Sequence, residues 1–446
     1  MNHALRIVGR SLALAASVLP TLAWAQAEQP TSGHFSYVGR EADAAWRKQA
    51  LDRIELIRKG DFGVRVEDAS GAPVPGASVR IEEVNSAFQW GSALQFERLV
   101  RDTPENRRYR EMVLKLFNEA SPENDLKWPN WEGDWGPGFS HEQAIAALHW
   151  LKDRRFYVRG HNLIWPGKGA EWKDLPKSIR ELKGTPRQGE IPGMILAHIR
   201  DITSATRGLI DEWDVVNEPW DHHAIMDLFG PKIMVDWFKA AQAGLPGGLL
   251  YLNDWGNQGL LGENPSHWRN TFETAAYLRG LGAPLTALGL QCHINRNPTA
   301  PEDFLAALDL YAALRIPIRI TEFDINTDDE ALQADYTRDF FIAAFSHPSV
   351  IGVQLWGFWE KAHWRPKGAM YRTDWSEKPN GAVYRSLVLD QWRTREAGVT
   401  DQGGRYAGRG FYGTYRVVVR AGDRRAERTF ALVSGGPSPD VEVRIP

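Results

Sequence analysis

The segment Ile318-Arg319-Ile320-Thr321-Glu322-Phe323-Asp324 is short and strand-like and carries two carboxylates near its end. Seven further short strand-like runs occur along the chain, and longer helical stretches separate them. Alternation of strand and helix is typical of a parallel sheet in an α/β fold, and eight such units are typical of a closed (β/α)8 TIM barrel. We therefore predict this barrel, with strands at residues 88–93, 116–121, 157–164, 210–217, 248–253, 287–293, 318–324 and 350–356.

Hydrogen-bonding and aromatic residues end almost every predicted strand. In barrels of this type the catalytic groups lie at the C-terminal ends of the strands. Stability alone does not require such residues there, so we interpret them as a functional cleft. In chain order they are Glu123, Asn124, Lys127, His161, Trp165, Asn217, Glu218, Asn253, Asp254, Gln291, His293, Glu322, Asp324, Trp356 and Trp359.

Two glutamates stand out among these residues. Glu218 ends the fourth predicted strand and Glu322 lies near the end of the seventh, so the two can face each other across the barrel mouth. Two facing carboxylates are the minimal machinery for cleaving a glycosidic bond: one protonates the leaving oxygen, and the other attacks the sugar or activates water. The alternative is a pair of solvated or salt-bridged acids, which is the weaker interpretation for two apolar strand ends.

His293 and Asp324 are predicted to support the second glutamate. Side chains alternate along a strand, so Gln291 shares a face with His293, and Glu322 shares one with Asp324. His293 could then bond both carboxylates, which would fix its tautomer. A metal site is the rival, but the chain has no HExxH or paired-His spacing, so we predict neither a metal nor a cofactor.

These segments resemble glycoside hydrolase family 10, the family of retaining endo-β-1,4-xylanases, over roughly residues 86–395. The resemblance is carried by Phe117-Asn118 and by the patterns at residues 123–128, 159–165, 213–218, 289–293 and 320–325. It implies that Glu218 is the acid/base, Glu322 the nucleophile and Asn217 the donor to the sugar 2-hydroxyl. It also implies glycone subsites and aromatic walls formed by Glu123, Asn124, Lys127, His161, Trp165, Gln291, Trp356 and Trp364.

The sequence departs from the family pattern at several positions. Pro166 stands where many relatives carry a second His, Trp255 stands where a Tyr is usual, and Cys292 replaces the usual Ser. The stretch at residues 356–360 is bulkier than the common form. Both glutamates are retained, so we expect these changes to affect the shape of the subsites rather than the chemistry.

We therefore expect a retaining endo-β-1,4-xylanase that hydrolyses xylan by double displacement. One alternative is a related β-1,4-glycosidase that acts exo or on short oligosaccharides, and another is a non-catalytic carbohydrate-binding barrel. The expected partner is a polysaccharide, either xylan or xylo-oligosaccharides. A net charge of only −3 gives no electrostatic argument for nucleic acid or an anionic membrane, and we expect a monomer.

The N-terminus resembles a signal peptide over residues 1–27. Arg6 and Arg10 precede a short apolar stretch, and small residues follow it as cleavage sites. The rival is a membrane anchor, but the apolar stretch is well short of the ~20 residues that a spanning helix needs. We therefore expect export to the periplasm or the outside of the cell, with the single Cys292 leaving no internal disulfide.

The two ends of the mature chain are predicted to fold together. A helix at residues 41–59 and strands at 62–67 and 77–82 precede the barrel, and strands at 413–420, 427–433 and 441–445 follow it. Neither group can bury its apolar face alone, since an isolated hairpin is marginal in water. We predict one small β-sandwich from residues 28–85 and 396–446, with the barrel of residues 86–395 inserted between its halves. The alternative is two unrelated additions to the barrel.

Overall fold

The structure is a computed structural model that describes residues 36–260, 265–295 and 297–446. The predicted signal peptide at residues 1–27 lies outside these residues. Within the described part, no helix is both long enough and apolar enough to cross a membrane.

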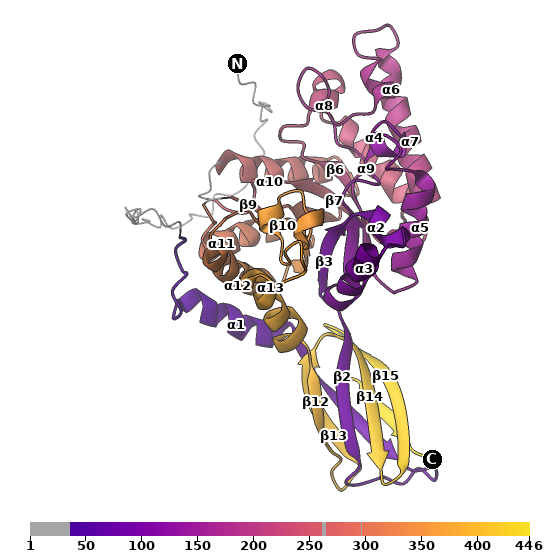
Figure 1. The fold of residues 1–446 in the computed structure, drawn as a ribbon, viewed down its shortest axis with the longest axis vertical. Coiled ribbons are helices and arrows are strands. Elements are labelled where there is room, and N and C mark those ends of the chain that lie inside the picture. Colours follow the sequence, from indigo (N-terminus) through magenta and orange to yellow (C-terminus); the bar gives the residue numbers. More distant parts are fainter. Residues whose placement is uncertain (1–35, 261–264, 296) are drawn as a thin grey trace. The chain divides into compact units, whose positions relative to one another are not determined.

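Eight parallel strands close into a barrel, as predicted (Figure 1). The hydrogen-bonded order runs β3-β4-β5-β6-β7-β8-β10-β11, and β11 pairs with β3 to complete the ring. A two-residue strand, β9, extends the top of β8 and pairs with β10. The strands are β3 (Gln89–Leu94), β4 (Glu119–Pro122), β5 (Tyr157–Gly160), β6 (Glu212–Asn217), β7 (Leu249–Asp254), β8 (Ala287–Leu290), β9 (His293–Ile294), β10 (Ile318–Ile325) and β11 (Val350–Leu355).

Helices connect these strands and bury their apolar faces against them. Several begin at a residue whose side chain accepts a hydrogen bond from a backbone N–H of the first turn, as with Thr103, Ser140 and Asp329. The helices are α1 (Ala45–Ile57), α2 (Phe96–Val100), α3 (Pro104–Leu116), α4 (Trp128–Trp131), α5 (His141–Lys152), α6 (Lys177–Arg180), α7 (Ile191–Ala205), α8 (Ala224–Phe229), α9 (Ile233–Gly244), α10 (Pro265–Gly280), α11 (Pro301–Ala312), α12 (Glu330–Ser346) and α13 (Pro379–Tyr384).

Three predicted strands begin or end three or more residues from the observed position, and one of them, predicted at 287–293, ends at Leu290. The strand predicted at 116–121 begins only at Glu119, because Leu116 completes the buried face of α3. The strand predicted at 157–164 ends at Gly160, where the Trp213 ring would lie only 2.2 Å from an added Cβ atom. The neighbouring strand therefore packs its indole against bare backbone at this point, and the chain turns into the cleft-forming loop.

The lower barrel interior is charged rather than apolar. Arg159 bonds Glu212 at 2.6 Å and Asp214 at 2.5 Å, while Arg319 bonds Glu119 at 2.5 Å and Glu212 at 3.1 Å. All five side chains are fully buried. Removing one member would leave an uncompensated buried charge, which costs about 3–5 kcal/mol. The network therefore fixes the strands beneath the catalytic end.

Strands from both ends of the chain form two further sheets, with orders β13-β1-β16 and β12-β2-β14-β15. Figure 1 shows the purple β2 between the yellow β12 and β14. The sheets share one core, in which Val64 and Val66 of β1 are fully buried with Val417 and Val419 of β14. The strands are β1 (Lys59–Glu67), β2 (Ser78–Ser86), β12 (Arg395–Val399), β13 (Arg405–Phe411), β14 (Gly413–Ala421), β15 (Arg424–Leu432) and β16 (Asp440–Arg444).

The predicted fold class is therefore confirmed, but two strands of the sandwich were missed. No strand was predicted between Arg395 and Gly413, whereas β12 and β13 form in this stretch. Its glycines admit neighbouring rings, since a Cβ at Gly408 would lie 2.5 Å from Phe62 and one at Gly410 would lie 2.4 Å from the Tyr415 hydroxyl. Glycine weakens a strand in isolation, but here it allows close packing.

Candidate active site

A cleft of about 730 Å³ opens at the C-terminal ends of the barrel strands. Four of the residues predicted at strand ends do not line the cleft: Asn253, Asp254 and Trp359 are buried outside its lining, and Asp324 lies behind His293, to which it is bonded. The other twelve predicted site residues line it: Glu123, Asn124, Lys127, His161, Trp165, Asn217, Glu218, Gln291, His293, Glu322, Trp356 and Trp364. The strands therefore bring together residues that lie up to 241 positions apart in the sequence.

Glu218 follows β6 directly, and its backbone φ of 53° lies in the left-handed region that non-glycine residues rarely adopt. Its N–H donates to the carbonyl of Asn253, which holds this conformation. The side-chain Oε1 accepts a hydrogen bond from Gln291 at 2.8 Å, and Oε2 accepts one from Trp165 at 3.2 Å. Such backbone conformations cluster at functional sites, and both carboxylate oxygens are held in the cleft.

The surroundings of Glu218 favour a protonated carboxyl group. Burial raises the pKa of Glu218 to about 7, and the negative charge of Glu322 acts in the same direction. His222 opposes both, because its charge favours the ionised form. A carboxylic acid with a pKa near neutrality can give up a proton and take one back, which is what a general acid/base requires.

Glu322 has the opposite character. Its Oε1 accepts from the Asn253 amide at 2.9 Å, and its Oε2 lies 3.0 Å from His293 Nε2. Burial alone would raise the pKa of Glu322, but the hydrogen bond from His293, the charge interactions with His161 and His293 and the bond from Asn253 together outweigh burial and lower it. Glu322 is therefore a carboxylate under conditions in which Glu218 keeps its proton.

His293 is held between two carboxylates. Its Nδ1 lies 3.0 Å from Asp324 Oδ2, and that oxygen also accepts from the Trp364 indole at 2.7 Å. Burial opposes the charge on His293, but Asp324 and Glu322 together raise its pKa to about 9. At neutral pH His293 is therefore a cation that donates to both carboxylates and fixes Glu322 in place.

The predicted reason for the placement of His293 was wrong. Strand alternation was expected to put Gln291 and His293 on one face, but the strand breaks between β8 and β9. Cys292 lies at the break with a φ of 61° and is fully buried. This turn directs both neighbouring side chains into the cleft.

One side of the cleft carries polar groups over aromatic surfaces. Lys127 donates to Asn124 at 2.9 Å, and its ammonium lies 4.9 Å from the centre of the Trp165 ring. His161 Nδ1 lies 2.8 Å from Asp214, and its ring packs edge-on to Trp356 at 4.9 Å. Fixed donors beside indole faces are suited to a sugar, which offers hydroxyl groups at its edge and C–H groups on its faces.

Asn217 is oriented by its neighbour Asn253, whose amide donates to Asn217 Oδ1 at 2.9 Å. This bond leaves the Asn217 NH₂ group to donate to a ligand. Asn253 also donates to Glu322, so a single amide connects the two strand ends. The sequence placed Asn253 at a strand end but gave no indication of this bridging position.

The structure adds a cluster beside Glu218 that was not predicted. His222 Nδ1 lies 3.3 Å from Glu218 Oε2 and 3.0 Å from Asp221, and its Nε2 lies 3.2 Å from Asp174. Asp221 also pairs with Lys168 at 2.5 Å. The available signal was the spacing of four residues between Glu218 and His222, but nothing in the sequence connects either residue to Asp174.

Ligand atoms of Glu218, Asp221 and His222 lie within 4.8 Å of one another, so the group has the size of a metal site. However, the bonds to Asp174 and Asp221, together with the charge of Glu218, overcome burial and raise the pKa of His222 to about 9. A protonated imidazole has no lone pair for a metal. In the described structure hydrogen bonds and ion pairs hold the group together, and a metal would have to displace the proton of His222.

Comparisons with known proteins agree with this geometry. A family model described as glycosyl hydrolase family 10 matches residues 81–385. The anti-sigma-I factor RsgI6 of Acetivibrio thermocellus is 30% identical over 407 residues, which are 90% of this chain and 50% of that protein. Endo-1,4-beta-xylanase 1 of Arabidopsis thaliana is 26% identical over 387 residues, 86% of this chain and 39% of that protein. The chain thus spans half or less of the length of these two relatives.

Among solved structures, xylanase 10B from Thermotoga petrophila in complex with xylobiose superposes with a TM-score of 0.60 at 22% identity. The match covers 68% of this chain and 95% of that one. Native xylanase 10B from Thermotoga maritima gives a TM-score of 0.59 at 22% identity, with 68% and 96% covered. These similarities show a shared barrel fold.

Proposed function

The chain belongs to glycosyl hydrolase family 10, and we propose that it is a retaining endo-β-1,4-xylanase. The observation that carries the proposal is the contrast between two buried carboxyl groups in one cleft. Burial raises the pKa of Glu218 to about 7, whereas the hydrogen bonds and charge interactions of Glu322 together overcome burial and lower its pKa. A proton donor beside a nucleophile is the pair that double displacement requires.

In the first proposed step, the Glu322 carboxylate attacks the anomeric carbon and Glu218 gives its proton to the leaving glycosidic oxygen. The C–O bond to the leaving chain breaks as the bond to Glu322 forms, which produces a glycosyl-enzyme ester. The bonds that Glu322 receives from Asn253 and His293 orient it for this attack. The Asn217 NH₂ group is the proposed donor to the sugar 2-hydroxyl, a bond that strengthens in the transition state.

In the second proposed step, Glu218 removes a proton from water, and the resulting hydroxide attacks the anomeric carbon from the face that the leaving group vacated. Glu322 leaves as a carboxylate, so the sugar keeps its configuration. While Glu322 is esterified it carries no charge, so one of the causes that raise the pKa of Glu218 disappears. The charge on His222 remains and favours the basic form that this step needs.

Linear xylan is the substrate that tests this proposal. We expect new reducing ends with a rapid fall in polymer length, and a first-formed product in the β configuration by proton NMR. Release of single xylose units from a chain end would favour the exo-acting alternative. Binding of xylan without any new reducing ends would favour the non-catalytic barrel, and an α-configured first product would contradict retention.

A further inference from the structure

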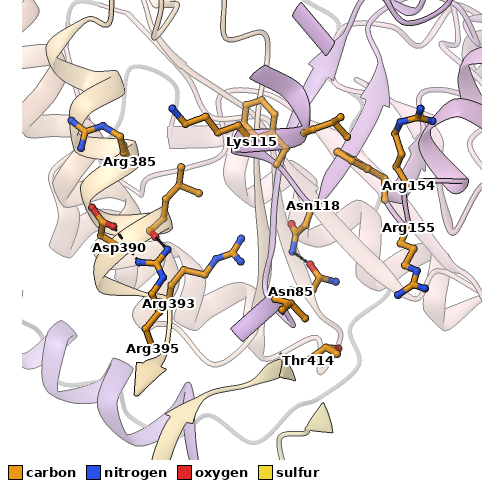
Figure 2. Close-up of a pocket in the computed structure, with 15 residues that line it drawn as sticks. Asn85, Lys115, Asn118, Arg154, Arg155, Arg385, Asp390, Arg393, Arg395 and Thr414 are labelled. Carbon is orange, nitrogen blue, oxygen red and sulfur yellow. Dashed lines mark hydrogen bonds and ion pairs between the residues drawn. The ribbon is translucent and has the colours of Figure 1, made fainter. Parts of the chain in front are cut away.

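A second hollow lies at the opposite ends of the barrel strands from the catalytic cleft. It has a volume of about 800 Å³, shares no lining residue with the cleft, and adjoins β4 and β5 where these strands begin. One acidic side chain, Asp390, lines it. Six cationic side chains surround it, as Figure 2 shows: Lys115, Arg154, Arg155, Arg385, Arg393 and Arg395. We call this hollow the basic groove.

Much of the positive charge in the basic groove is not neutralised. Arg385 pairs with Glu377 and Arg395 with Asp390. Among the residues that the structure describes, Lys115, Arg154 and Arg155 form no ion pair. Arg154 donates to the Trp150 carbonyl and lies 4.3 Å from the centre of that ring, so its guanidinium keeps further donors available. In a chain with a net charge of −3, this concentration of unpaired cations is a local exception.

The form of the groove is fixed by the fold around it. Asn118 donates to Asn85 at 3.2 Å and to the Ser86 carbonyl at 3.0 Å, which joins the barrel wall to the end of β2. The groove continues past Asn118 and Arg155 into a smaller hollow of about 250 Å³. The groove alone has the volume of an ordinary ligand site, since such sites occupy about 300–1,000 Å³.

The groove also has apolar surface between its charges. Leu114 is 47% exposed and Val84 is 46% exposed, and both line it. Arg155 adopts a φ of 61°, a left-handed conformation at the end of α5 that usually selects glycine or asparagine. An arginine therefore stands at a position where glycine or asparagine would be less strained.

We propose that the basic groove binds an acidic polysaccharide chain, specifically xylan that carries uronic acid substituents, as a second attachment site away from the catalytic cleft. This inference rests on the proposed function for the identity of the polymer backbone. Guanidinium groups bind carboxylates in a bidentate manner, and apolar side chains pack on sugar C–H faces. The groove offers both kinds of contact in one open channel.

Other polyanions fit the groove less well. Phe117 and Phe156 line it but are buried, so bases of a nucleic acid find no exposed ring on which to stack. Binding to an anionic membrane requires apolar side chains that insert into the lipid surface beside the cations. The cations here surround a hollow instead, which suits a narrow chain.

The test compares a glucuronoxylan with the same polymer after reduction of its carboxyl groups, in a Glu322→Gln background that leaves both polymers uncut. The test variant is Lys115→Gln/Arg154→Gln/Arg155→Asn, where asparagine tolerates the left-handed backbone. The matched control Lys48→Gln/Arg207→Gln/Arg424→Gln removes the same charge from exposed positions outside both cavities. Binding is measured by calorimetry at about 0.01 M and about 0.15 M salt.

We expect the test variant to bind the acidic polymer about tenfold more weakly at low salt, which three exposed charge pairs can supply. The control variant should bind like the parent protein, and the reduced polymer should not distinguish the variants. Equal binding of the acidic polymer by test and control variants would overturn the proposal, as would tighter binding of DNA or of phosphatidylglycerol vesicles through the same residues. Failure of the active protein to cut linear xylan would contradict the proposed function instead.

Discussion

Replacing His222 with glutamine should move the pH dependence of catalysis upward. His222 Nδ1 lies 3.3 Å from Glu218 Oε2, and with its pKa raised to about 9 the imidazole is charged throughout the neutral range. This charge lowers the pKa of Glu218 against the effects of burial and of Glu322. Without it, the positive charge that contacts Glu218, Asp174 and Asp221 together is lost, so the pKa of Glu218 should rise further.

The size of the effect follows from the geometry. An opposite charge in contact with a carboxylate lowers its pKa by about 1–3 units, and the existing bonds of His222 to Asp174 and Asp221 place the effect near the lower end. We therefore expect a rise of about one unit from the present value of about 7, or about 1.4 kcal/mol in favour of the protonated acid. Because Glu218 must be protonated to act as an acid, activity should persist to higher pH.

The measurement is kcat/KM on xylohexaose against pH, where the alkaline limb reports the acid of the free enzyme. His222→Gln should move this limb from about pH 7 toward about pH 8. His222→Lys, which restores a positive charge, should move it back. The matched control is His223→Gln, since His223 is the adjacent histidine and pairs with the exposed Asp227 rather than with Glu218. An unchanged or lowered alkaline limb in His222→Gln would refute the electrostatic argument.

Three further outcomes test the roles and the fold. Glu322→Ala should abolish turnover of both xylan and nitrophenyl xylobioside, and residual burst release of nitrophenol would contradict its role as nucleophile. Glu218→Ala should release nitrophenol in a burst, because that leaving group needs no proton, and hydrolysis of the glycosyl-enzyme should then stall. Identical behaviour of both variants would contradict the assignment of Glu218 as acid/base and Glu322 as nucleophile. Val443→Ala removes two buried methyl groups from the sandwich core and should lower the free energy of unfolding by about 2 kcal/mol, measured with urea. An unchanged transition would contradict a core shared between the two ends of the chain.

The barrel was predictable because each of its strands carries local information. A short run such as that of β10 is buried along its whole length, with Arg319 in the charged lower interior and Glu322 and Asp324 where the strand reaches the cleft. Strand ends were less predictable, since Leu116 is equally suitable for the buried face of a helix. β12 and β13 carry no such pattern. Gly408 leaves room for the ring of Phe62, which lies on β1 more than 300 positions earlier, and Gly410 leaves room for Tyr415 on the following strand β14. These two strands are stabilised by pairing with β1 and β2, and the local sequence does not predict that pairing.

The catalytic glutamates were predictable from local sequence, whereas the cluster of Asp174, Asp221 and His222 beside Glu218 was not. Glu218 and Glu322 are fixed by strands, whereas Asp174 reaches His222 from a loop in which Trp172 and Asp174 both adopt positive φ values, of 53° and 72°. No simple propensity predicts two non-glycine residues in that conformation so close together. If loop residues set the charge around the acid/base, substitutions at Asp174 or Asp221 should change the pH range in which the enzyme is active. They should have less effect on which glycosidic bond is cut. The barrel strands would then determine the reaction, and the loops would determine the conditions under which it proceeds.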